Sequence, residues 1–313
     1  MADILDGRAF GSVTVHAPRQ RRRRRRRLLL AAVIVAAVLS VVAARYLLDD
    51  RRRDYLSTNG WPLLGQGAYQ LGDQRPAASP DQRPAPIASL AKVMTAYLVL
   101  RREPLTGGTD GPTLTVTAAD VTDTEQRRRR DESVVDVAAG EELTERQALM
   151  AVLLPSANNI AVLLARHVAG SVAAFVTEMN ETARALGMPD TTYTDPSGFD
   201  DRTVSTAKDQ LTLALVVARD PTLAAMMATS SYVLPVAGTI HNTDTLLGQD
   251  GFVGMKTGSD DAAGGCFMFR SRRVVDEHDV DLIGVVMGQP GRDLITAGLY
   301  AAKQLADSVA RAA

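Results

Sequence analysis

Residues 28–44 form an apolar stretch that contains one polar residue, Ser40, and no charged residue. A run of about 17 residues exceeds the usual core of a signal peptide, roughly 7 to 15 residues, and is at the short end of a membrane span. Seven consecutive arginines at 21–27 come directly before it, and the positive-inside rule places such a block in the cytoplasm. We therefore expect residues 28–48 to be a transmembrane anchor. A removed signal peptide, with the small residues 42–44 as its cleavage site, is the alternative.

Both interpretations export everything that follows the apolar run. The expected organisation is a cytoplasmic arginine-rich tail at 1–27, the anchor at 28–48, a charged linker at 49–60 and one folded domain at 61–313. The cytoplasmic membrane is then a partner of the chain. A nucleic-acid-binding arm is not favoured for the arginine block, because the apolar run abuts it directly.

From residue 61 the pattern of apolar positions is that of a folded domain containing both helices and strands. Residues 67–72 alternate like a first strand, and a proline-rich turn leads into a helix that begins near Ser89. Its apolar positions have the 3.6-residue spacing of a buried helix and are Leu90, Val93, Met94, Tyr97 and Leu98. Two short strands are expected at 113–117 and 133–137. Arginines 127–130 would then occupy a solvated hairpin tip, or grip an anionic polymer.

The middle third of the domain is expected to be nearly all helical. A capping box of Thr144 and Gln147 opens one helix, which ends at Pro155. Ser171 is expected to cap a later helix. Strand character returns at 232–236, 252–257, 265–270 and 281–287, and the last two runs are joined by a charged turn, which suggests an antiparallel sheet. An amphipathic helix closes the chain. The fold class is therefore α/β in the broad sense of mixed helices and strands, and more narrowly α+β, because the sheet is expected to be antiparallel.

Composition excludes several classes of protein. The formal net charge of −1 over 313 residues argues against nucleic acid as a partner. Cys266 is the single cysteine, so no intrachain disulfide can form, and a small core residue is its expected role. The four histidines are scattered without ligand spacing, so neither a zinc hydrolase nor a histidine-dependent triad is supported.

Candidate chemistry starts with Ser89 and Lys92. Residues three apart share a helix face, so the lysine can reach the serine and take its proton once burial or a neighbouring positive charge lowers its pKa. Alone, this S-x-x-K spacing is weak evidence for a catalytic pair. It gains weight from two later motifs, Ser156-x-Asn158 in a break between helices and Lys256-Thr257-Gly258 on a strand.

The three motifs, in this order and context, resemble those of the D-alanyl-D-alanine carboxypeptidases, which are low-molecular-mass serine penicillin-binding proteins. The resemblance runs from about residue 66 to the end and includes the stretches 88–96, 155–159, 195–200, 205–209 and 254–258. It implies a β-lactamase/transpeptidase-like fold, in which helices flank an antiparallel sheet and a helical lobe is inserted between the serine helix and the lysine strand.

The resemblance also implies roles for individual residues. Ser89 would attack the carbonyl of a terminal D-Ala-D-Ala bond in a peptidoglycan stem peptide, with Lys92 as the base. Ser156 would relay a proton to the leaving amine, and Asn158 would position Lys92 and the substrate amide. The expected substrate-binding residues are Lys256, Thr257, Gly258, Ser259 and Arg292, with backbone N–H groups of Ser89 and Ser259 as the oxyanion donors. β-Lactams would acylate the serine, and no cofactor or metal is expected.

Three alternatives to this function remain open. A class A β-lactamase shares the motifs but needs a deacylating glutamate in an E-x-x-L-N pattern, and none follows Ser156. A D,D-endopeptidase acting on cross-links would use the same residues. A catalytically silent wall-binding protein is the non-enzyme hypothesis. Arg292 has its own alternative, an arginine on the surface at the start of a helix.

Overall fold

The computed structural model describes residues 60–106 and 108–313. The tail and anchor predicted from the sequence, and all but the last residue of the linker, lie outside the described residues. Within the described part, no single helix is long and apolar enough to cross a membrane. One pair, α5 (Asn158–Ala169) with α6 (Val172–Ala185), meets that length and hydropathy only together and is bent by 85°.

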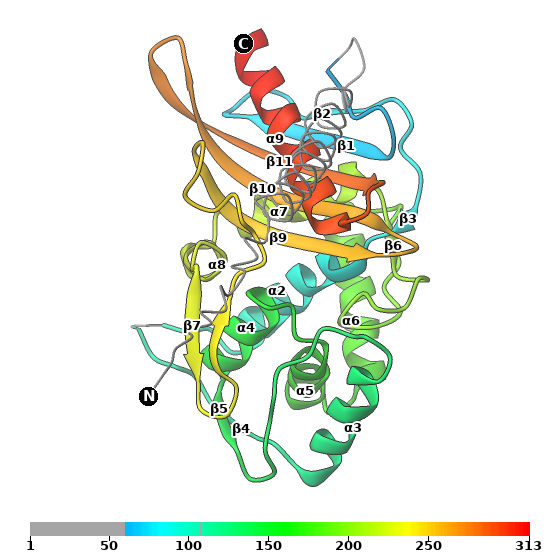
Figure 1. The fold of residues 1–313 in the computed structure, drawn as a ribbon, viewed down its shortest axis with the longest axis vertical. Coiled ribbons are helices and arrows are strands. Elements are labelled where there is room, and N and C mark those ends of the chain that lie inside the picture. Colours follow the sequence, from blue (N-terminus) through cyan, green and yellow to red (C-terminus); the bar gives the residue numbers. More distant parts are fainter. Residues whose placement is uncertain (1–59, 107) are drawn as a thin grey trace, which may run out of the picture. The chain divides into compact units, whose positions relative to one another are not determined.

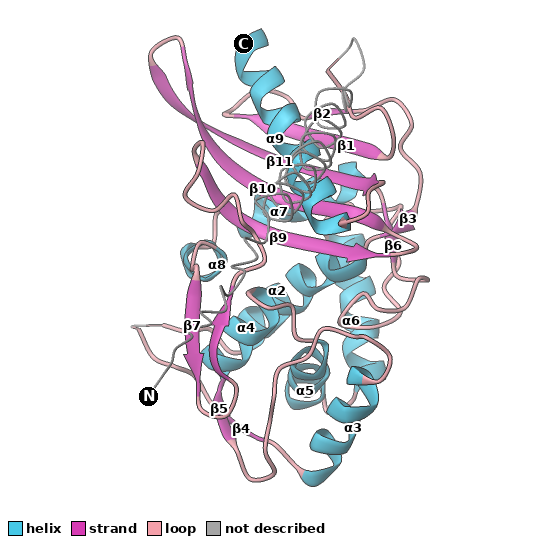
Figure 2. Ribbon diagram, in the orientation of Figure 1, coloured by secondary structure: helices cyan, strands magenta, loops and turns pink. Residues whose placement is uncertain are grey.

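A five-stranded antiparallel sheet in the order β2-β1-β11-β10-β9 is the main layer (Figures 1 and 2). Its strands are β1 (Gln66–Leu71), β2 (Ala77–Ala78), β9 (Phe252–Asp260), β10 (Gly264–Val275) and β11 (His278–Gln289). The expected antiparallel pairing of the last two strands is confirmed, with Met268 opposite Val285. Successive residues of β10 enter different clusters, since Phe267 belongs to one core and Met268 to the other. Both faces of the sheet are therefore buried.

Helices cover the two faces of this sheet. The closing helix α9 (Leu294–Ala312) contributes Leu299 and Leu305 to the core that contains Phe267. On the other face, α7 (Ala207–Val217) contributes Leu211 and Leu213 to the larger core, and Figure 1 shows it behind the sheet. The expected order of sheet, flanking helices and closing helix is confirmed. The fold places the β9 edge next to the helical lobe.

The helical lobe lies between Ser89 and β9 in the chain. Its helices are α2 (Ala91–Arg102), α3 (Ala118–Arg128), α4 (Glu145–Leu153), α5, α6 and α8 (Pro221–Met227). Three small strand pairs accompany them: β3 (Ala85–Pro86) with β6 (Val204–Ser205), β4 (Thr113–Thr115) with β5 (Glu142–Thr144), and β7 (Ser231–Leu234) with β8 (Gly238–His241). The capping box of Thr144 and Gln147 is confirmed at the start of α4, as is the Ser171 cap of α6.

The expected hairpin through the arginine run is wrong. β4 pairs with β5, and residues 133–137 form no strand. The backbone of this segment is bound to α5 instead. Ser133 O accepts from Asn158 N at 2.8 Å, and the Asn159 amide bonds both backbone groups of Val135. The predicted solvated tip is helical through Arg128 because Thr117 and Asp120 form a capping box that starts α3.

Glu145, the first residue of α4, is buried, and burial away from water disfavours its ionised carboxylate. Neither of its carboxylate oxygens has a hydrogen-bond partner among the described residues, and burial, with a smaller effect of Glu103, raises its pKa to about 7. The ionised form therefore opposes folding. This cost is absent below the ordinary pKa of 4.5, grows as the pH rises from there to about 7, and is constant above that value.

We expect Glu145→Gln to stabilise the protein at pH 8 by on the order of 1 to 2 kcal/mol and to have little effect at pH 4.5. Urea unfolding at both values measures the difference. Glu142→Gln, at an exposed carboxylate of β5, is the matched control and should change stability little at either pH. A Glu145→Gln variant that is less stable at pH 8 than the unaltered protein would contradict this interpretation.

Candidate active site

Ser89 and Lys92 lie within hydrogen-bond distance where the sheet meets the helical lobe. Ser89 is the middle residue of a 3-10 turn, Ala88–Leu90, and Lys92 is the second residue of α2. Lys92 Nζ is 2.8 Å from Ser89 Oγ and donates to Ser197 O at 2.7 Å. Ser89 is half-buried and lines a pocket, whereas Lys92 is fully buried. The hydroxyl is accessible to a ligand, and the amine is shielded from water.

The environment of Lys92 favours its neutral form. Burial is the first cause that holds its pKa well below 10.5, and the positive charge of Lys256 is the second; Asp195 and Glu132 oppose them. A neutral amine has a lone pair that can accept the serine proton, which an ammonium lacks. The distance between the two groups and the downward shift of the Lys92 pKa are therefore those that a nucleophile and its base require.

Two glycines let other segments pack against the nucleophile turn. Gly198 has φ 78°, and a Cβ there would lie 1.8 Å from Ala88 O. A Cβ on Gly258 would lie 3.2 Å from Ser89 N and 3.1 Å from Leu90 N. The third motif ends in glycine because a side chain there would crowd the backbone of the nucleophile turn. Ala88 itself has φ 44°, a conformation that costs a non-glycine residue energy and that contacts on both sides maintain.

Ser156 and Asn158 lie in the connection from α4 to α5. Ser156 has φ 68°, and its buried Oγ has no hydrogen-bond partner in the part of the chain that the structure describes. Asn158 Nδ2 donates to Glu132 at 2.8 Å, while its Oδ1 is equally buried and unpartnered there. A strained backbone and buried polar atoms without hydrogen-bond partners are typical of functional sites.

Lys256 and Thr257 lie on β9, the edge strand beside the nucleophile turn. Lys256 is 1% exposed and donates to Thr257 O at 3.0 Å. Burial lowers its pKa to about 7, against the opposing effect of Asp244. Thr257 Oγ1 is 2.5 Å from Thr243 Oγ1, so this hydroxyl is held by a neighbouring segment. A lysine with such a pKa changes its charge in the neutral range.

Several of the predicted site residues line a pocket of about 380 Å³. Its wall contains Ser89, Asn158 and Ser259, one from each of the three motif regions. Lys92, Ser156, Lys256 and Thr257 are buried and are not part of that wall. Arg292 is exposed in the bend between β11 and α9, away from the pocket lining, so its substrate-binding role stays a prediction.

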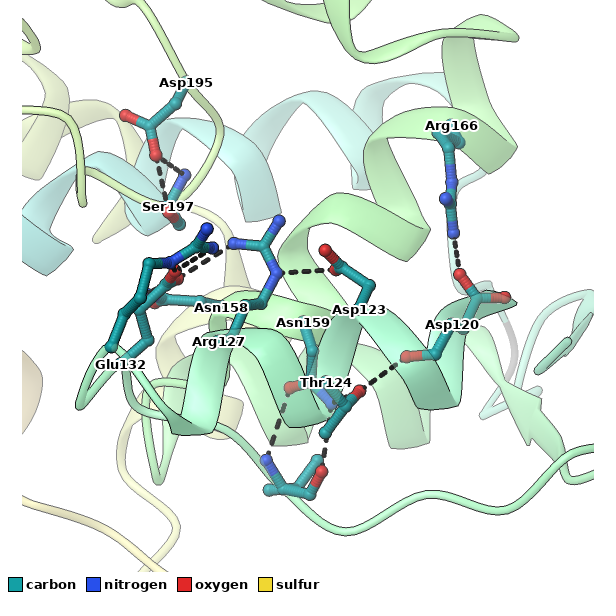
Figure 3. A network of polar contacts seen from close by, with 12 residues as sticks. Asp120, Asp123, Thr124, Arg127, Glu132, Asn158, Asn159, Arg166, Asp195 and Ser197 are labelled. Carbon is teal, nitrogen blue, oxygen red and sulfur yellow. Dashed lines mark hydrogen bonds and ion pairs between the residues drawn. The ribbon is translucent and has the colours of Figure 1, made fainter. Parts of the chain in front are cut away.

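Sequence reasoning missed several residues of the site. Glu132 lines the pocket and contacts Asn158 (Figure 3). The loop at 195–200 was recognised as similar to the family, but not its function here, in which Ser197 O binds Lys92. Asp195 holds that loop by accepting from Ser197 N and Thr203 Oγ1. The Asp-Pro-Ser-Gly turn was the available signal, whereas Glu132 had none.

Metal ligands and the single cysteine would be other sources of chemistry among the described residues. No group of three or more metal-ligating side chains occurs among residues 60–106 and 108–313. Cys266 is buried in the core, as expected, and burial raises the pKa of its thiol to about 12. Its thiol is therefore a poor nucleophile.

A family model described as D-alanyl-D-alanine carboxypeptidase matches residues 77–291. The chain belongs to this family. The D-alanyl-D-alanine endopeptidase of Escherichia coli is 32% identical over 211 residues, which cover 63% of this chain and 62% of that protein. D-alanyl-D-alanine carboxypeptidase DacB2 of Mycobacterium tuberculosis is 33% identical over 204 residues, covering 63% and 66%. The chain thus spans less than two thirds of the length of these relatives.

Two solved structures have a fold similar to that of this chain. Penicillin binding protein 5 from Haemophilus influenzae has a TM-score of 0.68 at 23% identity, over 78% of this chain and 70% of that one. A Streptomyces DD-transpeptidase has a TM-score of 0.67 at 24% identity, over 79% and 97%. The β-lactamase/transpeptidase-like arrangement of antiparallel sheet and helices that the resemblance implied is therefore confirmed for the described residues.

Proposed function

We propose that this protein is a serine-type D-alanyl-D-alanine carboxypeptidase that removes the terminal D-Ala from peptidoglycan pentapeptide stems through an acyl-enzyme. The observation that carries the proposal is the 2.8 Å contact between Ser89 Oγ and a fully buried Lys92 whose pKa is strongly lowered. Membership of the family supplies the substrate class. Penicillin and other β-lactams are the corresponding covalent inhibitors.

In the proposed reaction, Lys92 takes the proton of Ser89 while Oγ attacks the carbonyl carbon of the D-Ala-D-Ala bond. The carbonyl oxygen gains negative charge and accepts from the backbone N–H groups of Ser89 and Ser259. The tetrahedral intermediate collapses as the proton held by Lys92 is relayed through the Ser156 hydroxyl to the leaving nitrogen, which returns Lys92 to its neutral form. Free D-alanine departs, and water then cleaves the ester at Ser89, which regenerates the enzyme.

Binding of the terminal carboxylate is assigned to the third motif. Thr257 offers a hydroxyl and Lys256 a cation whose charge a bound carboxylate would stabilise. Gly258 lets β9 approach the nucleophile turn closely enough for a peptide to contact both. Arg292 is a further candidate for this carboxylate, because guanidinium binds carboxylate in a planar two-point fork.

A D,D-endopeptidase that cleaves cross-links is the second candidate. It is favoured by the names of two relatives, the endopeptidases of Escherichia coli and Pseudomonas aeruginosa, which are 32% and 31% identical to this chain. The same nucleophile, base and oxyanion donors would serve both reactions. The two activities differ in whether the group beyond the cleaved bond is a free D-alanine or a cross-linked peptide.

Mass analysis of two digests separates these candidates. We expect purified protein to convert a D-Ala-D-Ala pentapeptide into a tetrapeptide and D-alanine faster than it splits a cross-linked peptide dimer. Ser89→Ala should lack both activities and is the control for contaminating enzymes. Faster cleavage of the dimer would assign the protein as an endopeptidase, and no cleavage of either by folded protein would contradict both candidates.

The location of this activity is proposed from the sequence. With the arginine block of residues 21–27 in the cytoplasm, the domain would lie outside the cytoplasmic membrane, where peptidoglycan is found. Protease added to spheroplasts should then digest the domain. Full protection of the domain would contradict this topology.

A further inference from the structure

Glu132 is a buried carboxylate at the pocket wall that the proposed reaction does not use. It lies four residues after the last residue of α3, and its side chain is 0% exposed. Its Oε2 accepts from Arg127 Nη1 at 2.9 Å and from Asn158 Nδ2 at 2.8 Å. Its Oε1 accepts from Arg130 Nε at 3.0 Å and Nη2 at 2.6 Å. Two guanidinium groups thus compensate for the burial of this charge, as a buried carboxylate requires.

The orientation of the Asn158 amide follows from this contact. An ionised carboxylate can only accept hydrogen bonds, and of the two ends of an asparagine amide only the nitrogen donates. Glu132 therefore holds Nδ2, and Oδ1 must point the other way. Asn158 is 4% exposed and lines the pocket beside Ser89, and its buried Oδ1 has no partner among the residues described. A buried acceptor without a partner is suited to a donor that arrives with the ligand.

The same carboxylate is connected to the loop that holds Lys92. Arg130, bound to Glu132, lies over the Phe199 ring at 5.9 Å. Two residues before Phe199, Ser197 O accepts from Lys92 Nζ at 2.7 Å. Figure 3 shows Asn158 and Arg127 converging on Glu132, with Ser197 and Asp195 nearby. Glu132 is in this way connected to Asn158 directly and to the Lys92 loop through Arg130.

We propose that Glu132 is a positioning residue for acylation, which fixes the Asn158 amide with Oδ1 turned toward the substrate's amide N–H. The inference rests on the proposed function and adds a residue to it. Without the carboxylate, the amide can rotate by half a turn and present Nδ2 to the pocket, where a donor would face the donor of the substrate. Acylation should then slow, although Ser89 and Lys92 are unchanged.

The test is a double-mutant cycle on the rate constant for acylation by benzylpenicillin. Glu132→Gln keeps the shape but can also donate, so we expect acylation to slow by about 10- to 100-fold. Asn158→Asp places two carboxylates against each other and should slow it more than 100-fold. In the combined Glu132→Gln and Asn158→Asp variant, the new amide can donate to the new carboxylate. We expect it to acylate at least about 10-fold faster than Asn158→Asp alone.

Asp136→Asn is the matched control for loss of a carboxylate in the same segment. Asp136 accepts from Arg128 at 2.6 Å, and its side chain is 70% exposed. This variant should acylate within about twofold of the unaltered protein. If Glu132→Gln does not fold, Glu132→Asp keeps the charge for both arginines but shortens the reach to Asn158, and it should slow acylation in the same direction.

The pH profile distinguishes positioning from a general loss of structure. The negative charge of Glu132 raises the pKa of Lys92, so its removal should move the acidic limb of the acylation profile to lower pH. A purely structural defect would lower the rate without moving this limb. If Glu132 were instead a base for deacylation, Glu132→Gln would leave acylation unchanged and lengthen the lifetime of the adduct.

Two outcomes overturn the proposal. One is a Glu132→Gln variant that acylates at the rate of the unaltered protein. The other is a combined variant no faster than Asn158→Asp alone. Both presuppose that the unaltered protein is acylated. If it is not, the proposed function fails first, so the two failures are distinguishable.

Discussion

Replacing Lys92 is expected to slow acylation of Ser89 by roughly 100- to 10,000-fold, the usual contribution of a general base. Lys92 Nζ lies 2.8 Å from Ser89 Oγ, and burial favours its neutral form. Lys92→Ala and Lys92→Met should show similar losses, because methionine fills the space of the lysine but supplies no base. Stopped-flow or quench measurements with benzylpenicillin give the rate constant for each variant.

The pH dependence of the unaltered protein provides the control for this assignment. Lys92 acts as a base when neutral, so the rate should rise with pH through its lowered pKa, well below 10.5. A carboxylate-bearing ligand should bind more weakly as the pH rises through about 7 and Lys256 loses its charge. A bell-shaped profile is therefore expected. Near-normal acylation by Lys92→Met at neutral pH would contradict the role of Lys92.

Gly198→Ala should slow acylation by about 100-fold or more, because a Cβ at this position would lie 1.8 Å from Ala88 O. The carbonyl it meets belongs to the residue before the nucleophile. Either Ser89 or the loop that holds Lys92 must move, and a displacement of about 1 Å in a catalytic group is enough for such a loss. Acylation and thermal unfolding are both measured on the variant.

Gly187→Ala is the matched control. Gly187 has the same φ of 78° as Gly198, but a Cβ there would meet nothing within 4 Å. It should lose about 1 kcal/mol of stability from the left-handed backbone alone and keep its acylation rate. If both alanine variants acylate equally, the close approach of Gly198 to the nucleophile turn has no catalytic importance.

The sequence predicted those parts of the fold that local signals determine. Apolar alternation identified β10 and β11, and side-chain caps located the starts of α4 and α6. The same local signals predicted that Ser89 and Lys92 share a helix face, and the structure puts them in a 3-10 turn and in the α-helix that follows it. These features depend on residues a few positions apart, so the information is contained in short stretches of sequence.

Parts that depend on distant contacts were not predictable in this way. Residues 133–137 alternate like a strand, but their hydrogen bonds go to Asn158 and Asn159 of α5. The arginine run looked like a charged surface loop, yet Arg127 and Arg130 bind the buried Glu132. Likewise, Ser197 O reaches Lys92 across 105 positions of sequence. Tertiary contacts of this kind override local propensity.

Intact-mass measurement after incubation with benzylpenicillin, followed by peptide mapping, tests the central claim most directly. The protein should gain the mass of one benzylpenicillin molecule, and the modified peptide should contain Ser89. The adduct should persist, since no E-x-x-L-N motif for a deacylating water follows Ser156. Folded Ser89→Ala should gain no mass. An adduct located on any other residue, or a folded Ser89→Ala protein that is still acylated, would contradict the assignment of Ser89 as the nucleophile.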